Sequence, residues 1–382
     1  MRILVINATT DLYGANRILS LALKTFPSES RIQLLLPELK GPLVAFIEKN
    51  NPGVIMVECP SLPVIQRKMF SISGGLQAIK LVKDFYRFLK YEHQKEPIDL
   101  LYVNTLSNFL VLPIASRLKI KTLVHVHEIL ESPKIVSQII NKYSLKWATS
   151  ILAVSHAVKD NLLKAGSSFE DKIKVIHNGI PDLFSPDTTF KNDPDKCTIT
   201  LIARIKPEKG IWYFLEALDL IKDKSSVRVR IIGGPAPFGE KYVNKLIQDI
   251  TKSVIEIQYI PFTTEVSKYL NATDILVVPS IMKDPFPTTV LEGMCCAKAV
   301  VATDTGGAAE AIVHGQSGLL IKNDDTHRFA LELDNLIADA SERKRLGVNA
   351  REKYMKNFSI SSYHNRMSQF VNIQLHSIQE KV

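Results

Sequence analysis

Short apolar runs alternate with helix-like stretches along most of this chain. In the first half, such runs occupy residues 2–6, 31–36, 54–57, 99–103, 121–126, 150–154 and 173–176. Continuous apolar runs of this length are typical of strands buried on both faces, and the intervening helices would cover a parallel sheet. The alternation therefore predicts an α/β fold.

One stretch interrupts the alternation. Residues 181–196, PDLFSPDTTFKNDPDK, are rich in Pro, Asp, Asn and Lys, which is typical of an interdomain linker. The apolar runs resume at 198–203, 227–232, 255–260, 274–279, 299–304 and 318–321, and the rest of the chain is helix-like. Because 382 residues also exceed the usual size of one domain, we expect two α/β domains, residues 1–185 and 186–360.

The chain is basic, with a net charge of +9 and a pI of about 9.2. This charge favours anionic partners such as nucleotides, nucleic acid or an acidic membrane surface. The aromatic residues do not alternate with Lys and Arg in one stripe, and no nucleic-acid motif occurs. We therefore expect no nucleic acid partner.

The cysteines and the apolar runs of the sequence indicate the cellular compartment of the protein. Cys59, Cys197, Cys295 and Cys296 show no CxxC spacing, so we expect reduced thiols in a cytosolic protein. The N-terminus has too short an apolar run for a signal peptide, and no run approaches the length of a membrane span. The sequence predicts a cytoplasmic protein that could still rest on a membrane.

Ligands of open parallel sheets bind beyond the carboxyl ends of the strands, so the loops after the strands are the places to search for a site. After the first strand, Gly14 precedes a helix expected to begin near Ala15. A glycine there lets the backbone approach a phosphate, and the helix offers free amides. A plain strand–helix turn would have the same sequence, and both interpretations stay open.

A second candidate follows the strand at 121–126. His125 and His127 point to the same face of that strand, and His127 and Glu128 lie where it gives way to a loop. His127 is a candidate for a catalytic role, although a histidine at a strand end is often a hydrogen-bonded structural residue. No third ligand lies nearby at helical or hairpin spacing, so we expect no metal site.

In the second domain, the loop ARIKPEKGI at 203–211 places Arg204 and Lys209 around a proline turn. Arg can bind phosphate oxygens through two N–H groups, and Lys adds a point charge. The pair suits a diphosphate leaving group. A solvated, charged turn would have the same composition.

The corner DPFPTTVLEGM at 284–294 carries two acids, Asp284 and Glu292, with a helix expected to begin at Thr288. Amides of Thr288, Thr289 and Val290 are expected to be free to bind phosphate. Glu292, four residues after Thr288, would lie on the same face and accept hydrogen bonds from ribose hydroxyls. The corner therefore predicts a nucleotide site.

A diglycine, Gly306 and Gly307, precedes another short helix whose first turn holds Glu310. Such a pair allows close approach of a ligand or of a neighbouring backbone, and the sequence does not decide between them.

Taken in order, these segments resemble glycosyltransferase family 4, whose fold is GT-B. The motifs are YGANR, VHVHE with Glu128 in the place of an Asp, VSHAVKDNL, VIHNGI, ARIKPEKGI, DPFPTTVLEGM as the E-x7-E motif, and TGGAAEAI. The resemblance covers nearly the whole chain. One departure is Asp284, which stands where the family has a glutamate and is shorter by one methylene.

The resemblance implies two Rossmann-like domains, with 361–382 a helix that crosses back to the first, and a retaining transfer from a nucleotide-sugar donor. It implies catalytic roles for His127, Arg204, Lys209 and Asp284. Donor binding would involve Gly14, Arg204, Lys209, Thr288, Thr289, Val290 and Glu292. The nucleotide sugar is a substrate, and neither a cofactor nor a metal ion is expected, since Arg204 and Lys209 would stabilise the departing diphosphate.

The acceptor-binding residues stay unassigned. The family implies a glycan or lipid-linked acceptor in bacterial-type surface polysaccharide biosynthesis. The basic segment 66–95, with Lys68, Lys80, Lys83, Arg87 and Lys90, could contact anionic lipid on the inner face of the plasma membrane, or be a solvated helix face.

Other functions fit parts of this pattern. The GT-B fold also hosts epimerases that process nucleotide sugars, and the shorter Asp284 is compatible with an inactive homologue that only binds the nucleotide sugar. A nucleic-acid-binding module fits the charge alone.

Overall fold

The structure is a computed structural model that describes residues 1–65, 72–184, 195–236 and 239–379. Lys68 and residues 185–194 of the predicted linker lie outside the described residues. The chain forms two compact units, one of Met1–Asn178 with Tyr363–Val382, the other of Gly179–Ser362. The sequence-based limits fall at 185 and 360.

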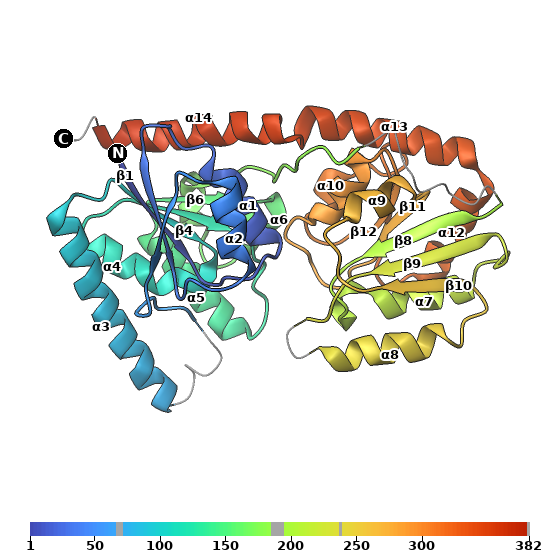
Figure 1. Ribbon diagram of the computed structural model, residues 1–382, viewed down its shortest axis with the longest axis horizontal. Coiled ribbons are helices and arrows are strands. Elements are labelled where there is room, and N and C mark those ends of the chain that lie inside the picture. Colours follow the sequence, from blue (N-terminus) through green and yellow to red (C-terminus); the bar gives the residue numbers. More distant parts are fainter. Residues whose placement is uncertain (66–71, 185–194, 237–238, 380–382) are drawn as a thin grey trace. The chain divides into compact units, whose positions relative to one another are not determined.

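The first unit contains a parallel sheet of seven strands in the order β3-β2-β1-β4-β5-β6-β7. Figure 1 labels three of them, β1, β4 and β6. The strands are β1 (Arg2–Asn7), β2 (Arg31–Leu36), β3 (Ile55–Glu58), β4 (Leu100–Asn104), β5 (Thr122–Val126), β6 (Ser150–Ala153) and β7 (Ile173–Val175). Each of the predicted runs is confirmed as a strand to within one residue at its ends. Burial of β1, β4 and β5 on both faces explains why their sequences are apolar throughout.

Helices connect these strands. They are α1 (Gly14–Leu23), α2 (Pro42–Asn50), α3 (Ile72–Lys95), α4 (Leu112–Arg117), α5 (Lys134–Trp147) and α6 (His156–Leu163), with 3₁₀ helices η2 (Leu106–Val111) and η3 (Ser167–Lys172). Helix α1 packs on α2, while α3, α4, α5 and α6 pack in series. The chain moves outward from β1 through β2 to β3, then returns to β4 on the other side of β1 and continues to β7. Because crossovers between parallel strands are right-handed, the helices that follow these two directions cover opposite faces of the sheet.

The last helix, α14 (Ile360–Gln379), belongs to the first unit from Tyr363 onward. Tyr363, Met367, Val371 and Leu375 recur every fourth residue, so they form one apolar stripe, and all four are buried. The hydroxyl of Ser150 on β6 donates a hydrogen bond to Gln374 of α14.

The second unit contains a parallel sheet of six strands in the order β10-β9-β8-β11-β12-β13. The strands are β8 (Cys197–Ile202), β9 (Val227–Ile232), β10 (Glu256–Ile260), β11 (Ile275–Val278), β12 (Ala299–Thr303) and β13 (Leu319–Ile321). The helices are α7 (Ile211–Asp219), α8 (Glu240–Ile250), α9 (Val266–Asn271), α10 (Thr288–Cys295), α11 (Ala308–Ala311), α12 (Thr326–Ala338) and α13 (Ala340–Asn357), with η4 (Pro207–Lys209). The predicted strands and the helical C-terminal part are confirmed.

In both sheets the strand order reverses beside the first strand, between β1 and β4 and between β8 and β11. Such a switch point leaves a crevice at the carboxyl ends of the strands, where ligands of doubly wound sheets bind. Within the described residues, no helix is both long and apolar enough to cross a bilayer.

Candidate functional site

In the second unit, the loops after β8, β11 and β12 pack on one another at the carboxyl edge of the sheet. The amide of Ile281 donates to the carbonyl of Glu208 at 3.1 Å, and the amide of Gly307 donates to the carbonyl of Asp284 at 2.8 Å. These backbone bonds join three loops into one layer, so the side chains that they carry share one edge of the sheet.

Two glycines permit this packing. Gly210 has φ +69°, and a Cβ there would lie 1.7 Å from the carbonyl oxygen of Pro279. Gly306 has φ +59°, and its Cβ would lie 2.2 Å from the carbonyl oxygen of Asp284. The diglycine thus packs against a neighbouring backbone, which is one of the two possibilities that the sequence left open.

Lys209 and Asp284 form an ion pair at this edge. The Lys209 Nζ lies 2.7 Å from both carboxylate oxygens of Asp284, and the Ser280 hydroxyl donates to the same carboxylate at 2.7 Å. Burial by itself raises the pKa of Asp284, but the Lys209 charge and the hydrogen bonds from Lys209 and Ser280 outweigh it, so this pKa lies below its ordinary value. Asp284 is therefore ionised at neutral pH.

Further cations surround the pair. Arg204, two residues after the end of β8, is exposed, and Lys206 is half-buried. Burial lowers the pKa of Lys206; the charge of Glu208 opposes this shift, and the charges of Arg204 and Lys209 add to it. Mutual repulsion between these cations would be relieved by a bound anion.

Helix α10 begins at Thr288 as predicted, and Thr288, Thr289 and Glu292 are half-buried. The Val290 amide donates to the carbonyl of Pro287 at 3.2 Å, so the expectation of a free amide at Val290 is wrong. Such a bond to the residue three positions earlier is common in the first turn of a helix.

In the first unit, a polar cluster occupies the carboxyl ends of β1, β4 and β5. The His127 Nε2 lies 3.1 Å from Asn104 Oδ1, and the Asn104 amide group donates to Asn7 Oδ1 at 2.8 Å. Burial lowers the pKa of His127 to about 3, so its ring is neutral at physiological pH. The rings of His125 and His127 have centroids 4.0 Å apart, as expected for residues on one face of the strand.

Glu128 joins the loops after β4 and β5. Its carboxylate accepts the amides of Leu106 at 3.1 Å and of His127 at 3.0 Å. Burial raises the pKa of Glu128 to about 7, although these two N–H groups favour its ionised form. Thr105, between β4 and η2, has φ +77°, which is a strained conformation for a β-branched residue.

Gly14 is the first residue of α1, and no atom lies within 4 Å of the position that its Cβ would take. The loop before it is held by the Asn16 amide group, which donates to Thr9 Oγ1 at 3.1 Å and to the Asp11 carbonyl at 2.8 Å. The backbone around Gly14 is therefore fixed, while the side-chain position is open.

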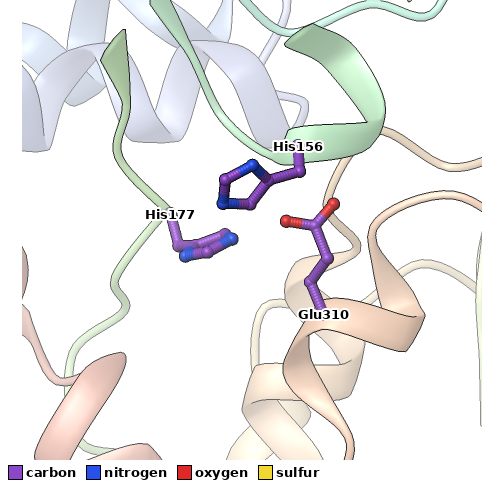
Figure 2. A group of neighbouring side chains, drawn as sticks. All are labelled: His156, His177 and Glu310. Carbon is purple, nitrogen blue, oxygen red and sulfur yellow. The ribbon is translucent and has the colours of Figure 1, made fainter. Parts of the chain in front are cut away.

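Two more histidines follow neighbouring strands of the first unit. Figure 2 shows the rings of His156, the first residue of α6, and His177, after β7; their centroids lie 5.9 Å apart. Glu310, also labelled there, belongs to α11 of the second unit. Both histidines lie in motifs of the resemblance, VSHAVKDNL and VIHNGI, that predicted no role for them.

The sequence-predicted residues thus occupy the carboxyl edges of two sheets. Lys209 and Asp284 are in contact, and Arg204, Thr288, Thr289, Val290 and Glu292 belong to the same unit, whereas Gly14 and His127 belong to the other. Asn7, Asn104 and Ser280 were missed. A signal existed, since VIN and YVN both end a buried apolar run in asparagine.

Comparisons with known proteins identify the family of the chain. Residues 187–353 match the family of glycosyl transferases group 1, and residues 32–182 match Glycosyltransferase Family 4. The α-maltose-1-phosphate synthase of Mycolicibacterium smegmatis is 27% identical over 59% of this chain and 63% of its own. The capsular polysaccharide biosynthesis glycosyltransferase CapM of Staphylococcus aureus is 24% identical over 59% and 61%. The matches therefore span less than two thirds of both relatives.

Among solved structures, Anabaena HepE in complex with UDP and glucose superposes with a TM-score of 0.79 at 21% identity, covering 97% of this chain and 99% of the other. At that identity the likeness establishes the fold. The two family matches together cover most of the chain, and the relatives are glycosyltransferases. The chain belongs to the family 4 type of glycosyltransferases and has the GT-B fold.

Proposed function

We propose that the protein is a retaining glycosyltransferase that moves a sugar from a nucleotide-sugar donor to a lipid-linked glycan acceptor in surface polysaccharide biosynthesis. One observation carries the proposal: Lys209, with Arg204 and Lys206 nearby in the same loop, is held by Asp284 at the carboxyl edge of the second sheet. The name of CapM and the UDP bound to HepE support the choice of a surface polysaccharide and of a nucleotide-sugar donor.

The cations suit a diphosphate. The Asp284 carboxylate neutralises Lys209 at 2.7 Å. A bound diphosphate would supply further negative charge to Lys209 and Arg204, so that the Asp284 oxygens could accept hydrogen bonds from the hydroxyls of the transferred sugar. As the bond to the sugar breaks, charge grows on the diphosphate, and Arg204 and Lys209 would stabilise it.

The start of α10 would hold the rest of the nucleotide. Amides of Thr288 and Thr289 lie in the first turn, where the helix dipole favours an anion. Glu292, one turn later, would accept hydrogen bonds from the ribose. His127 would contact a hydroxyl of the sugar or acceptor. The acceptor hydroxyl would attack the sugar carbon on the face that the leaving phosphate vacates, and its proton would pass to that phosphate. A trapped glycosyl-enzyme adduct would contradict this route.

Calorimetric titration tests the site. We expect binding of at least one nucleoside diphosphate among UDP, GDP and ADP, and a loss of tenfold or more in Lys209→Met. Lys252→Met, which removes an exposed lysine of the same unit, is the matched control. Absence of binding by all three nucleotides would overturn the proposal.

A second titration separates the residues that bind the diphosphate from those that bind the nucleoside. Glu292→Gln should weaken the nucleoside diphosphate but leave inorganic pyrophosphate unchanged, whereas Lys209→Met should weaken both. Equal effects of Glu292→Gln on both ligands would contradict a ribose contact. Turnover should also survive EDTA, because no step of the proposed chemistry uses a metal.

Because the proposed acceptor is linked to a lipid, the first unit would contact a membrane surface. Helix α3 exposes Leu76 and Ile79 beside Lys80, Lys83, Arg87 and Lys90. Helix α5 contains no Asp or Glu and exposes Ile135 and Ile139 beside three lysines. Both helices pack on α4, so they lie on the same face of the sheet. Such basic faces with apolar residues favour anionic lipid.

Flotation with vesicles tests this contact. We expect binding to vesicles that contain anionic phospholipid, no binding to neutral vesicles, and release by salt. Ile135→Asn, at a position that is 73% exposed, should reduce binding without changing nucleotide affinity. Equal recovery with neutral and anionic vesicles would contradict the charge-based part of the proposal.

A further inference from the structure

A directed chain of hydrogen bonds crosses the switch point of the first sheet. It runs from the Thr9 carbonyl through Asn7 at the end of β1 and Asn104 at the end of β4 to His127. Asn7 and Asn104 are 1% and 0% exposed, and they are paired in register on adjacent strands. Water therefore cannot replace these bonds, and each polar atom needs its partner within the protein.

The direction of the chain is fixed at one end. A carbonyl oxygen only accepts, so the group of Asn7 that lies 2.6 Å from the Thr9 carbonyl must be the NH₂. Asn7 then presents Oδ1 to Asn104, which must present its own NH₂. Asn104 is left with Oδ1 toward His127, and this oxygen needs a donor. The His127 Nε2 must therefore carry a hydrogen.

The surroundings keep the ring in place. His125 packs against it, and the Tyr102 hydroxyl lies 2.5 Å from Nδ1 of His125. Glu128 holds the main-chain amide of His127. The titratable groups that face His127 from its own unit are thus His125, Glu128 and, through His125, Tyr102. None of these contacts places a donor against Nε2, so none opposes the Nε2–H form.

We propose that Asn104 and Asn7 are positioning residues that hold His127 as the Nε2–H tautomer, with the lone pair on Nδ1. Nδ1 in this form accepts a hydrogen bond, so it suits a hydroxyl group of the sugar or acceptor and disfavours a phosphate oxygen. This consequence for the substrate rests on the proposed function. The tautomer itself does not, because it follows from contacts within the protein.

The tautomer is measured directly by NMR of ¹⁵N-labelled, ligand-free protein at pH 7. Long-range correlations between ring protons and nitrogens distinguish the two neutral forms, and His127→Gln assigns the signals. We expect the Nε2–H pattern for His127. An Nδ1–H pattern or an average of the two would overturn the proposal, whatever the result of the nucleotide titrations.

Variants of Asn7 and Asn104 test the chain of hydrogen bonds at the residues that precede His127. Asn7→Leu does not touch His127, yet it frees the Asn104 amide to rotate, so we expect the His127 signals to shift toward an average of both tautomers. Asn104→Asp places a carboxylate against Nε2–H and should raise the titration midpoint of His127 by about one unit or more. Asn141→Leu, which removes another buried asparagine of the same unit, should leave His127 unchanged. An unchanged tautomer in Asn7→Leu, given a folded protein by circular dichroism, would also overturn the proposal.

Discussion

The carboxyl edges of the two sheets use different physical means to build a site. In the first unit, the buried amides of Asn7 and Asn104 and the half-buried imidazole of His127 are neutral and are ordered by the direction of each hydrogen bond. In the second, a half-buried ion pair of Lys209 and Asp284 stands on loops joined by close backbone packing. Directed bonds select one protonation form, whereas charges select the sign of a ligand. The difference fits one edge for hydroxyl groups and another for a diphosphate.

The largest effect should follow from breaking the packing of the second edge. Gly210→Ala places a Cβ 1.7 Å from the Pro279 carbonyl, so we expect a loss of about 4 kcal/mol or more in the free energy of unfolding. Gly315→Ala has a similar φ, +72°, with no atom within 4 Å, and should cost only about 1–2 kcal/mol. Chemical denaturation measures both. Equal losses would mean that φ, and not the backbone contact, sets the cost.

The free energy of unfolding should depend on pH through Glu128, at the carboxyl edge of the first sheet. Its pKa in the folded protein is about 7, against an ordinary 4.5, so the protonated carboxyl stabilises the fold below pH 4.5 and that stability is lost as the pH rises through 7. The loss should reach about 3 kcal/mol and be missing in Glu128→Gln. The lowered pKa of His127 acts in the opposite direction, with stability lost as the pH falls below 6.5, but it is common to both proteins. Parallel pH curves of the two proteins would contradict the shift.

The ion pair of the second edge should give the next effect. Lys209→Met leaves Asp284 half-buried without its cation, and we expect a loss of about 2 kcal/mol at pH 7. Because the folded pKa of Asp284 is lowered, the pair contributes above the ordinary value of 3.8 and is lost as the pH falls below it. The difference between the two proteins should therefore shrink toward pH 3. A constant difference would indicate lost packing of the lysine stem instead.

The smallest effect on stability should come from Gly14→Ala. No atom lies within 4 Å of the new Cβ, so the free energy of unfolding should change by less than about 0.5 kcal/mol. If a phosphate approaches this backbone, the same variant should weaken donor binding severalfold. Unchanged donor affinity, measured by calorimetry, would leave Gly14 as an ordinary turn residue.

The strands were predictable because burial on both faces produces unbroken apolar runs, as at Ile3–Ile6 and Leu34–Leu36. The charged loop at Lys209 and the corner at Asp284 could also be located. Their pairing could not, since it depends on how two loops separated by 75 positions pack. The expected free amide at Val290 was wrong because a local turn with Pro287 satisfies it.

The hydrogen bond between Asn7 and Asn104 was missed for a related reason. Asparagine at a strand end is usually interpreted as a turn residue, and only the pairing of β1 with β4 shows that these two meet across 97 positions. In-register asparagines after neighbouring apolar runs are a pattern that a sequence can reveal once the strand order is known.

Most of helix α14 belongs to the first unit, although it lies at the C-terminal end of the chain. This matters for any experiment on the first unit alone. A fragment ending at Asn178 would lack the stripe of Tyr363, Met367, Val371 and Leu375 and would present the surface beneath it to solvent. Such a fragment invites aggregation in expression trials. A rearranged gene that fuses Tyr363–Val382 ahead of Met1 through a flexible spacer, or a synthetic peptide of that helix added in trans, would supply the missing cover.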